Sequence, residues 1–312
     1  MSKRFAAMNN VCNWRWPWTG LRSVHAIFLL AIFVLVVLAL TMKTQLMASP
    51  KVSVQEKDFH PIPYTTIAQC EREENGEFNC PDIRLKGPTL LRRCQLVLTR
   101  LIRVFDLIAK KHGIRYWLYR GTLLGAVRHN GHNPFDTDVD IAIPKADFDK
   151  FIKYGASELP DDIFLQTEET DPYYKVLFHS GMLGKLRDKK SCYQTCMSCK
   201  QAHGLQLDMF VVESDTDGNF IESYSDSKWY RRIIYGPIVR KKSEIFPLTE
   251  VNFDGFILPA PRKWKKMLTS LYGDFMTVPY DQPPGHIITD VLRSCEEIKE
   301  KTLELKSSNI SI

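Results

Sequence analysis

The sequence predicts one mixed α/β (α+β) domain preceded by a single N-terminal transmembrane helix. Three patterns predict this arrangement. Residues 24–42 are an uninterrupted apolar run, a helical hydrophobic period begins near Pro88, and short apolar runs with strand character alternate with helical stretches after it. A composition of 44% hydrophobic and 25% charged residues is that of a globular chain, and 312 residues are enough to bury a core.

Residues 24–42 contain no acidic residue, no Lys and no Arg. About 19 apolar residues suffice to cross a hydrocarbon core of roughly 30 Å as a helix. The apolar region of a cleaved signal peptide is normally shorter, about 7–15 residues, although Met47-Ala48-Ser49 leaves cleavage open. Residues 1–23 carry four basic residues and no acid. The positive-inside rule therefore predicts a cytosolic tail at 1–23, a signal-anchor at 24–42 and a luminal remainder.

The net charge follows from this topology. It is formally +6, but four of these charges belong to residues 1–23, which leaves 38 basic residues against 36 acidic ones. We therefore expect no nucleic-acid partner. A single-pass type II layout predicts residence in the Golgi or endoplasmic reticulum membrane, where disulfide bonds can form. Cys70 and Cys80 can close a small loop, and Asn309-Ile310-Ser311 is a glycosylation signal at Asn309.

Residues 43–86 are polar and proline-rich and predict a luminal stem. A catalytic domain is expected over 87–305 and a short tail over 306–312. A helix is predicted from Leu90 through Ile108 with its stop at Gly113, and two more between Pro144 and Tyr154 and over Arg262–Tyr272. Strands are predicted at Tyr116–Tyr119, Val139–Ile143, Val176–His179, Leu183–Arg187 and Leu205–Val212. Between Val212 and Arg262 the chain is expected to be looser.

Three alternate residues, Asp136, Asp138 and Asp140, carry the chemistry. On a strand they would share one face at spacings of roughly 6.5–7 Å. Clustered carboxylates raise one another's pKa unless a cation neutralises them, and an oxygen-only set suits Mg²⁺ or Mn²⁺ shared with a substrate diphosphate. A calcium loop would need Gly and Glu where Ile141 and Asp147 stand. A solvated loop and a glycosyltransferase D-x-D made of Asp138 and Asp140 remain open.

Groups that can bind the phosphates of a donor precede and follow the aspartates. Gly121 lets a backbone approach phosphate closely, and Thr122 can donate a hydrogen bond near a helix N-terminus. Arg128, Lys185 and Arg187 are candidate cations for a diphosphate, and the last two share a strand face.

A second possible metal site is the run Cys192-x₃-Cys196-x₂-Cys199-x₃-His203. Three thiolates and one imidazole would satisfy tetrahedral Zn²⁺. In an oxidising lumen, disulfide bonds are the alternative fate of these cysteines.

The segments YWL at 116–118, GTLLGAVR at 121–128 and PFDTDVDI at 134–141 resemble the signature of the LicD/fukutin family. A second resemblance covers residues 245–276. The resemblance as a whole implies a nucleotidyltransferase-like fold, a mixed sheet with flanking helices. It also implies an enzyme that moves a phospho-alcohol, such as phosphocholine or ribitol phosphate, from a CDP-linked donor to a glycan. It also implies that Asp208 is the third carboxylate, as metal ligand or base. Phe135 stands where the family usually has Trp, and the pair Tyr119-Arg120 departs from its pattern.

We therefore expect a luminal enzyme in which Asp138, Asp140 and Asp208 are catalytic and Asp136 assists them at the metal. Two alternatives stay open: a glycosyltransferase that uses a sugar nucleotide, and a non-catalytic member of a glycosylation complex.

Overall fold

The structure is a computed structural model that describes residues 59–175, 182–193, 200–222, 239–278 and 288–308, together with Leu30 and residues 32–34. The chain divides into two units, Met1–Pro50 and Lys51–Ile312, and the fold below is that of the second. Among the described residues, no helix is long and apolar enough to cross a membrane. Apart from those four residues, the expected anchor at 24–42 lies outside the described ranges, as do the expected strand at 176–179 and Asn309.

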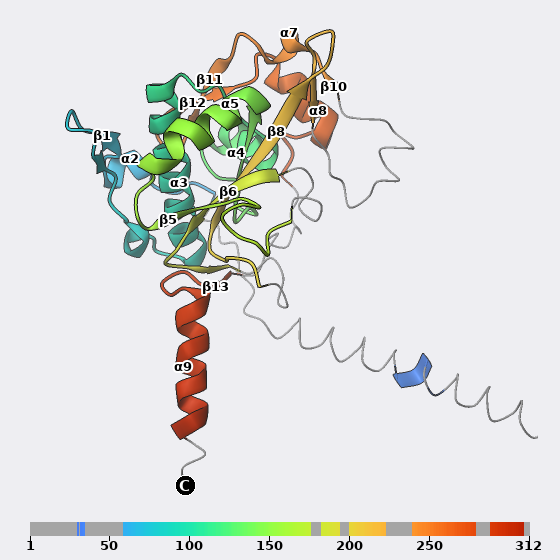
Figure 1. Ribbon diagram of the computed structural model, residues 1–312. Coiled ribbons are helices and arrows are strands. Elements are labelled where there is room, and N and C mark those ends of the chain that lie inside the picture. Colours follow the sequence, from blue (N-terminus) through green and yellow to red (C-terminus); the bar gives the residue numbers. More distant parts are fainter. Residues whose placement is uncertain are drawn as a thin grey trace, which may run out of the picture. The chain divides into compact units, whose positions relative to one another are not determined.

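A seven-stranded mixed sheet forms the centre of this unit (Figure 1). Strand β8 pairs in parallel with β4, and antiparallel with β6 along its first half and with β9 at Val212–Ser214. Antiparallel β3, β5 and β10 extend the sheet from β4, β6 and β9. The strands are β3 Trp117–Leu118, β4 Val139–Pro144, β5 Ile163–Gln166, β6 Met182–Asp188, β8 Gln206–Ser214, β9 Phe220–Glu222 and β10 Val239–Arg240. The predicted strands over β4, β6 and β8 are confirmed.

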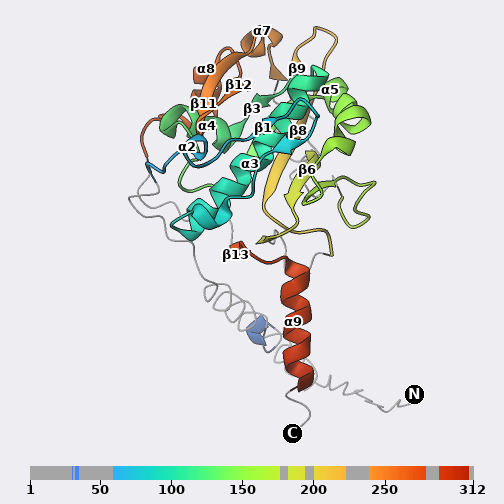
Figure 2. The same cartoon turned by 90° about the vertical axis from the view of Figure 1, so that its left-hand side faces the viewer.

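The longest helix of the domain, α3 (Leu90–His112), packs on β6 and β8, and Figure 2 shows it lying across the sheet. The Thr89 hydroxyl accepts a hydrogen bond from the Arg92 N–H at 3.0 Å and caps its start. Gly113 ends it in the left-handed conformation at φ 59°. Most of its apolar residues are buried in the core, so the predicted helix and its stop are confirmed.

The remaining elements partly correct the sequence analysis. Helix α4 runs from Arg120 to His129, so Gly121 and Thr122 lie in its first turn. The stretch expected to be loose contains a β-hairpin, and the helix expected at its end is α8. The other elements are α2 Tyr64–Ile67, β1 Glu71–Arg72, β2 Phe78–Asn79, η2 Arg84–Lys86, α5 Lys145–Lys150 with its π-helical and 3-10 extensions Phe151–Gly155 and Ala156–Glu158, β7 Cys192–Tyr193, α7 Lys242–Ile245, β11 Thr249–Phe253, β12 Phe256–Ala260, α8 Trp264–Tyr272, β13 Ile288–Asp290 and α9 Cys295–Ser308.

Residues 59–86 are folded against the domain that contains the sheet, so the part of the expected stem that the structure describes belongs to the folded unit. Tyr64 is fully buried, and the guanidinium of Arg84 forms a buried ion pair with Asp188 at 2.8 Å. Cys70 and Cys80 form a disulfide bond, which confirms the predicted small loop. The polar, proline-rich composition predicted a linker because the segment has no sustained apolar period. A few buried side chains attach it to the domain instead.

The C-terminal helix α9 is joined to the domain by a disulfide bond between Cys192 and Cys295. Both ribbon views show it extending away from the sheet (Figures 1 and 2). Because the helix runs to Ser308, the expected boundary between residues 305 and 306 falls inside it.

A buried polar network joins the hairpin β11–β12 to α3. Asp254, in the turn of the hairpin at φ 54°, accepts hydrogen bonds from the guanidinium of Arg92 at 2.8 and 3.1 Å and from the Thr99 hydroxyl at 2.6 Å. His132 adjoins the network, with its Nε2 2.8 Å from the Thr99 Oγ1. Burial, opposed by Asp254 and reinforced by Arg92, lowers the pKa of His132 to about 3.

The buried histidine predicts acid destabilisation. The unfolded chain binds a proton at His132 below about pH 6.5, whereas the folded chain does not until about pH 3, so stability falls as the pH drops through this window. Between pH 7 and pH 5 we expect the free energy of unfolding to fall by about 2 kcal/mol more in the wild type than in His132→Gln, because the full slope of about 1.4 kcal/mol per pH unit is reached only below the pKa of the unfolded histidine. Urea unfolding of both proteins at pH 7, 6 and 5 measures the difference, and equal slopes would contradict the prediction.

Candidate metal and donor site

Four side chains stand in one row across the sheet. Asp140 on β4 lies beside Asp208 on β8 in parallel register, and Lys185 on β6 lies opposite Asp208. Tyr119, which donates its backbone N–H to the Asp140 carbonyl at 3.1 Å, extends the row beyond β4. Asp138, just before β4, adds a third carboxylate. One oxygen from each of Asp138, Asp140 and Asp208 lies within 4.8 Å of the other two.

Asp208 is held by neighbours on both of its oxygens. Its Oδ1 accepts a hydrogen bond from the Lys185 ammonium at 2.7 Å, and its Oδ2 accepts one from the Gln206 amide at 3.0 Å. Lys185 is 1% exposed, and burial lowers its pKa while the Asp208 charge opposes that shift. The ion pair therefore fixes the orientation of the Asp208 carboxylate.

Both burial and neighbouring negative charge act on Asp140. Burial, and then the charges of Asp138 and Asp208, raise its pKa well above the usual range, with Arg120 acting in the opposite direction. The Thr122 hydroxyl accepts a hydrogen bond from the Asp140 N–H at 2.7 Å and fixes the start of β4. Mg²⁺ with ligands at about 2.1 Å holds its oxygens roughly 3–4 Å apart. The three carboxylates fit such a hard cation after small side-chain adjustments.

Asp136 lies outside this group of described carboxylates, which corrects the expectation that three aspartates share a strand face. It precedes β4, and its N–H donates to the Asn133 carbonyl at 3.0 Å in a turn. Its carboxylate accepts a hydrogen bond from the Asn133 amide at 3.2 Å. Burial and the neighbouring Asp138 raise its pKa to about 7. A turn breaks the two-residue alternation on which the expectation rested.

The carboxylate of Asp136 explains why position 121 is glycine. A Cβ atom on Gly121 would lie 2.2 Å from the Asp136 Oδ2 and 3.0 Å from its Cγ. We therefore expect Gly121→Ala to lower the free energy of unfolding by about 1–3 kcal/mol through overpacking. Thermal or urea unfolding measures this effect.

The matched control for Gly121→Ala is the double variant Gly121→Ala/Asp136→Ala, which removes the side chain that the new methyl group meets. It should unfold nearly as the single variant Asp136→Ala does. Strictly additive effects would show that the contact is not the reason for the glycine.

The predicted phosphate-binding cations are placed differently from one another. Arg128 on α4 donates to the Asn133 side chain at 3.1 Å and to the carbonyls of Phe275 and Thr277 at 3.1 and 3.3 Å. Arg187 is fully buried and bonds the Gln166 side chain and the Gly204 carbonyl. With Lys185 on Asp208, the structure gives each cation protein partners, and their binding of a donor stays a prediction.

The chain is similar in sequence to known proteins. Residues 113–263 match the model of the LicD/FKTN/FKRP nucleotidyltransferase domain. The lipopolysaccharide cholinephosphotransferase LicD of Haemophilus influenzae is 32% identical over 269 aligned positions, which cover 63% of this chain and 96% of that protein. The chain belongs to the LicD/FKTN/FKRP family. The family resemblance drawn from the sequence is thus confirmed.

Shorter matches accompany this one. Uncharacterized proteins of Rickettsia typhi and Rickettsia prowazekii are 41% and 48% identical over 66 residues, 21% of this chain and 21% and 25% of those proteins. A crystal structure of the lincosamide antibiotic adenylyltransferase LnuA with lincomycin bound aligns at 15% identity and a TM-score of 0.31, over 58% of this chain and 87% of that one.

The domain matched by the family model includes all three clustered aspartates, but the site reaches beyond it. The phenol of Tyr272, at the end of α8, lies close enough for Asp136 and Asp140 to raise its pKa, after burial as the largest cause. Arg120 lies near both Asp140 and this phenol. Sequence analysis assigned neither residue to the site. For Arg120 the signal was the departure from the family pattern at Tyr119-Arg120, and for Tyr272 it was the second resembling segment, residues 245–276.

One of the four residues that were expected to bind Zn²⁺ is not available as a ligand. Cys192 is bonded to Cys295, so its sulfur is not available as a thiolate. His203 is buried, and Cys196 and Cys199 lie outside the described residues. The disulfide alternative is therefore the one observed at Cys192.

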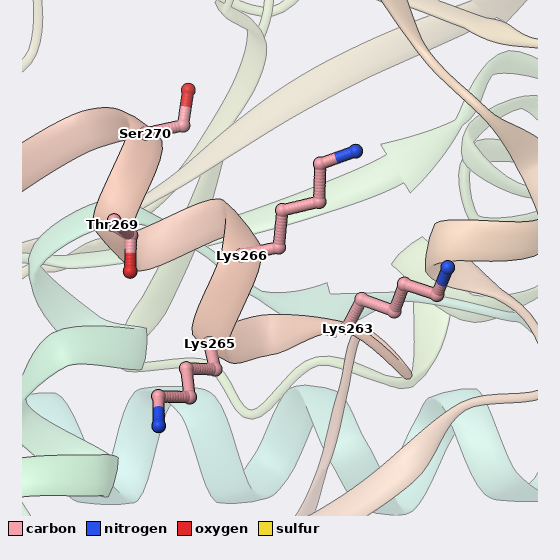
Figure 3. Close-up of a pocket in the computed structure, with 5 residues that line it drawn as sticks. All are labelled: Lys263, Lys265, Lys266, Thr269 and Ser270. Carbon is pink, nitrogen blue, oxygen red and sulfur yellow. The ribbon is translucent and has the colours of Figure 1, made fainter.

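A hollow of 620 Å³ on α8 is separate from the aspartate cluster. Three lysines with Thr269 and Ser270 line it, and no carboxylate does. Figure 3 shows that Lys265 and Lys266 point to different sides of the helix, so their charges do not converge on one point. The carboxylate cluster, rather than this surface, is the candidate site of the LicD-family chain.

Proposed function

We propose that this chain transfers a phospho-alcohol from a CDP-linked donor to a hydroxyl group of a glycan or glycoprotein. One observation carries the proposal: Asp138, Asp140 and Asp208 converge within 4.8 Å inside the matched LicD domain. The relative named a lipopolysaccharide cholinephosphotransferase, matched over 96% of its length, supports transfer of this kind.

The proposed reaction breaks the phosphoanhydride bond of the donor and forms a phosphate ester bond to the acceptor. The acceptor hydroxyl oxygen attacks the phosphorus that bears the alcohol. The bond from this phosphorus to the oxygen that bridges the two phosphates breaks, and CMP leaves with that oxygen. The hydroxyl proton is released, and the acceptor becomes a phosphodiester. Positioning and neutralisation of phosphate charge are the main tasks of a protein in such a transfer.

The three carboxylates are proposed to hold Mg²⁺ or Mn²⁺, which when bound supplies positive charge beside the diphosphate oxygens. Lys185 and Gln206 occupy both oxygens of Asp208, which favours the role of an oriented ligand over that of a base. Thr122 holds the Asp140 backbone in place. The protein therefore contributes three carboxylate oxygens that already lie close together before a metal binds.

A luminal location is part of the proposal. The apolar run at 24–42 and the basic residues 1–23 support a type II anchor in the Golgi or endoplasmic reticulum membrane. The two disulfide bonds, Cys70–Cys80 and Cys192–Cys295, agree with folding in an oxidising compartment.

The test is a donor screen with the full-length chain. It is incubated with Mn²⁺, a pool of cellular glycans and one donor at a time: CDP-choline, CDP-glycerol, CDP-ribitol or a UDP-sugar. We expect CMP release and products heavier by one phospho-alcohol, and EDTA should stop both.

Two results would replace the proposal with its alternatives. Products that gain a sugar from a UDP-sugar would identify a glycosyltransferase. A flat calorimetric titration with Mn²⁺ and CDP, together with no product from any donor, would identify a non-catalytic member of the family.

A further inference from the structure

Two aromatic rings stand beside the aspartate cluster on the same face of the sheet. Phe210 follows Asp208 by two residues on β8, and Tyr119 adjoins Asp140 through its backbone hydrogen bond. The ring centroids lie 5.4 Å apart at an interplanar angle of 58°. Both side chains are buried, at 7% and 2% exposure. They form a tilted aromatic pair next to the residues that would hold the metal and the donor phosphates.

Arg120 covers this pair. Its guanidinium carbon lies 4.1 Å from the centre of the Phe210 ring and 5.4 Å from that of the Tyr119 ring. The backbone of Arg120 is left-handed at φ 44°, an uncommon conformation for a residue with a Cβ, at the first position of α4. The same charge opposes the rise in the pKa of Asp140 and of the Tyr272 phenol, so the guanidinium lies near the cluster as well as over the rings.

Different alcohols of a CDP-linked donor would interact differently with Arg120 and the aromatic pair. A quaternary ammonium group such as that of choline is recognised by the faces of aromatic rings. Here the aromatic pair already carries a guanidinium, and a second cation at the same place would meet like charge. A guanidinium has several N–H donors and no acceptor, so it suits hydroxyl oxygens.

From these contacts we infer that Arg120 selects the transferred group: the site takes a neutral polyol phosphate and disfavours an alcohol that bears a quaternary ammonium. The inference rests on the proposed function, because it concerns the alcohol of the same CDP-linked donor. It separates this chain from the relative named a cholinephosphotransferase, to which it is 32% identical.

Binding measurements on the full-length chain test this selection without an acceptor. Isothermal titration with Mn²⁺ present compares CDP, CDP-choline, CDP-glycerol and CDP-ribitol. We expect the wild type to bind both polyol donors at least ten times more tightly than CDP-choline. Arg120→Asn, which removes the charge and tolerates the left-handed backbone, should reduce this preference at least tenfold. Arg120→Lys, which keeps the charge, should retain it.

Titration with CDP alone distinguishes selection of the alcohol from binding of the diphosphate. CDP should bind Arg120→Asn within threefold of the wild type, and a loss equal to that of CDP-glycerol would make Arg120 a diphosphate ligand and overturn the inference. CDP-choline bound by the wild type as tightly as CDP-glycerol would also overturn it, whether or not the variants fold. If the wild type binds none of the CDP compounds, the proposed function itself fails.

Discussion

Asp140→Asn is expected to lower transfer from the CDP-linked donor by at least about 10³-fold, equivalent to about 4 kcal/mol of transition-state stabilisation, while the domain stays folded. The variant keeps the shape of the side chain and the hydrogen bond from its N–H to Thr122, but removes one of three carboxylates that lie within 4.8 Å. Without metal, the variant should be at least as stable as the wild type, because the loss of one charge relieves repulsion. Turnover and thermal unfolding in EDTA measure the two effects.

Metal binding provides the second readout for this variant. Mn²⁺ at about 100 times its dissociation constant should stabilise the wild type by about 2.7 kcal/mol and should barely affect Asp140→Asn. Asp149→Asn is the matched control, because Asp149 is an exposed aspartate paired with Lys145, and it should behave as the wild type. An Asp140→Asn protein with normal turnover, or with an undiminished response to Mn²⁺, would remove Asp140 from the metal site.

The parts of the site that depend on local sequence patterns could be predicted from the sequence. The apolar alternation around Asp140 and Asp208 marks two strands, and the family resemblance joins these residues across nearly 70 positions. The parallel register that places them side by side is a tertiary property of β4 and β8. No local pattern shows that Lys185 would face Asp208 instead of a diphosphate, or that Gly121 accommodates the Asp136 carboxylate.

The fold was predictable where one element contains its own signal. Helix α3 has an apolar period, a capping threonine and a left-handed glycine within one segment. The hairpin β11–β12 also had a signal, since Asp254-Gly255 between alternating residues is typical of a two-residue turn. Residues 59–86 had none, because their attachment depends on single long-range contacts such as the ion pair from Arg84 to Asp188. Burial of such charges is decided by partners that are distant in sequence.

Asp254→Asn is expected to lower the free energy of unfolding by about 3–5 kcal/mol, the usual cost of removing one partner of a buried ion pair. Asp254 and Arg92 are each 3% exposed, and the lost charge would leave the Arg92 guanidinium buried without its counter-ion. Asn tolerates the left-handed backbone at this position, so the charge is the main change. Urea unfolding at pH 7 measures the loss.

A double-mutant cycle separates the ion pair from the turn that holds Asp254. Arg92→Met alone should also destabilise the chain, whereas Arg92→Met/Asp254→Asn should cost less than the sum of the two single variants, because no unpaired charge remains in the interior. Glu250→Gln, an exposed acid on the same hairpin, is the matched control and should change stability by less than about 0.5 kcal/mol. The Asp254 carboxylate also accepts hydrogen bonds from the Thr99 hydroxyl and the Tyr64 N–H. Additive effects of the two single variants would mean that these hydrogen bonds, rather than the ion pair with Arg92, are its main contribution to stability.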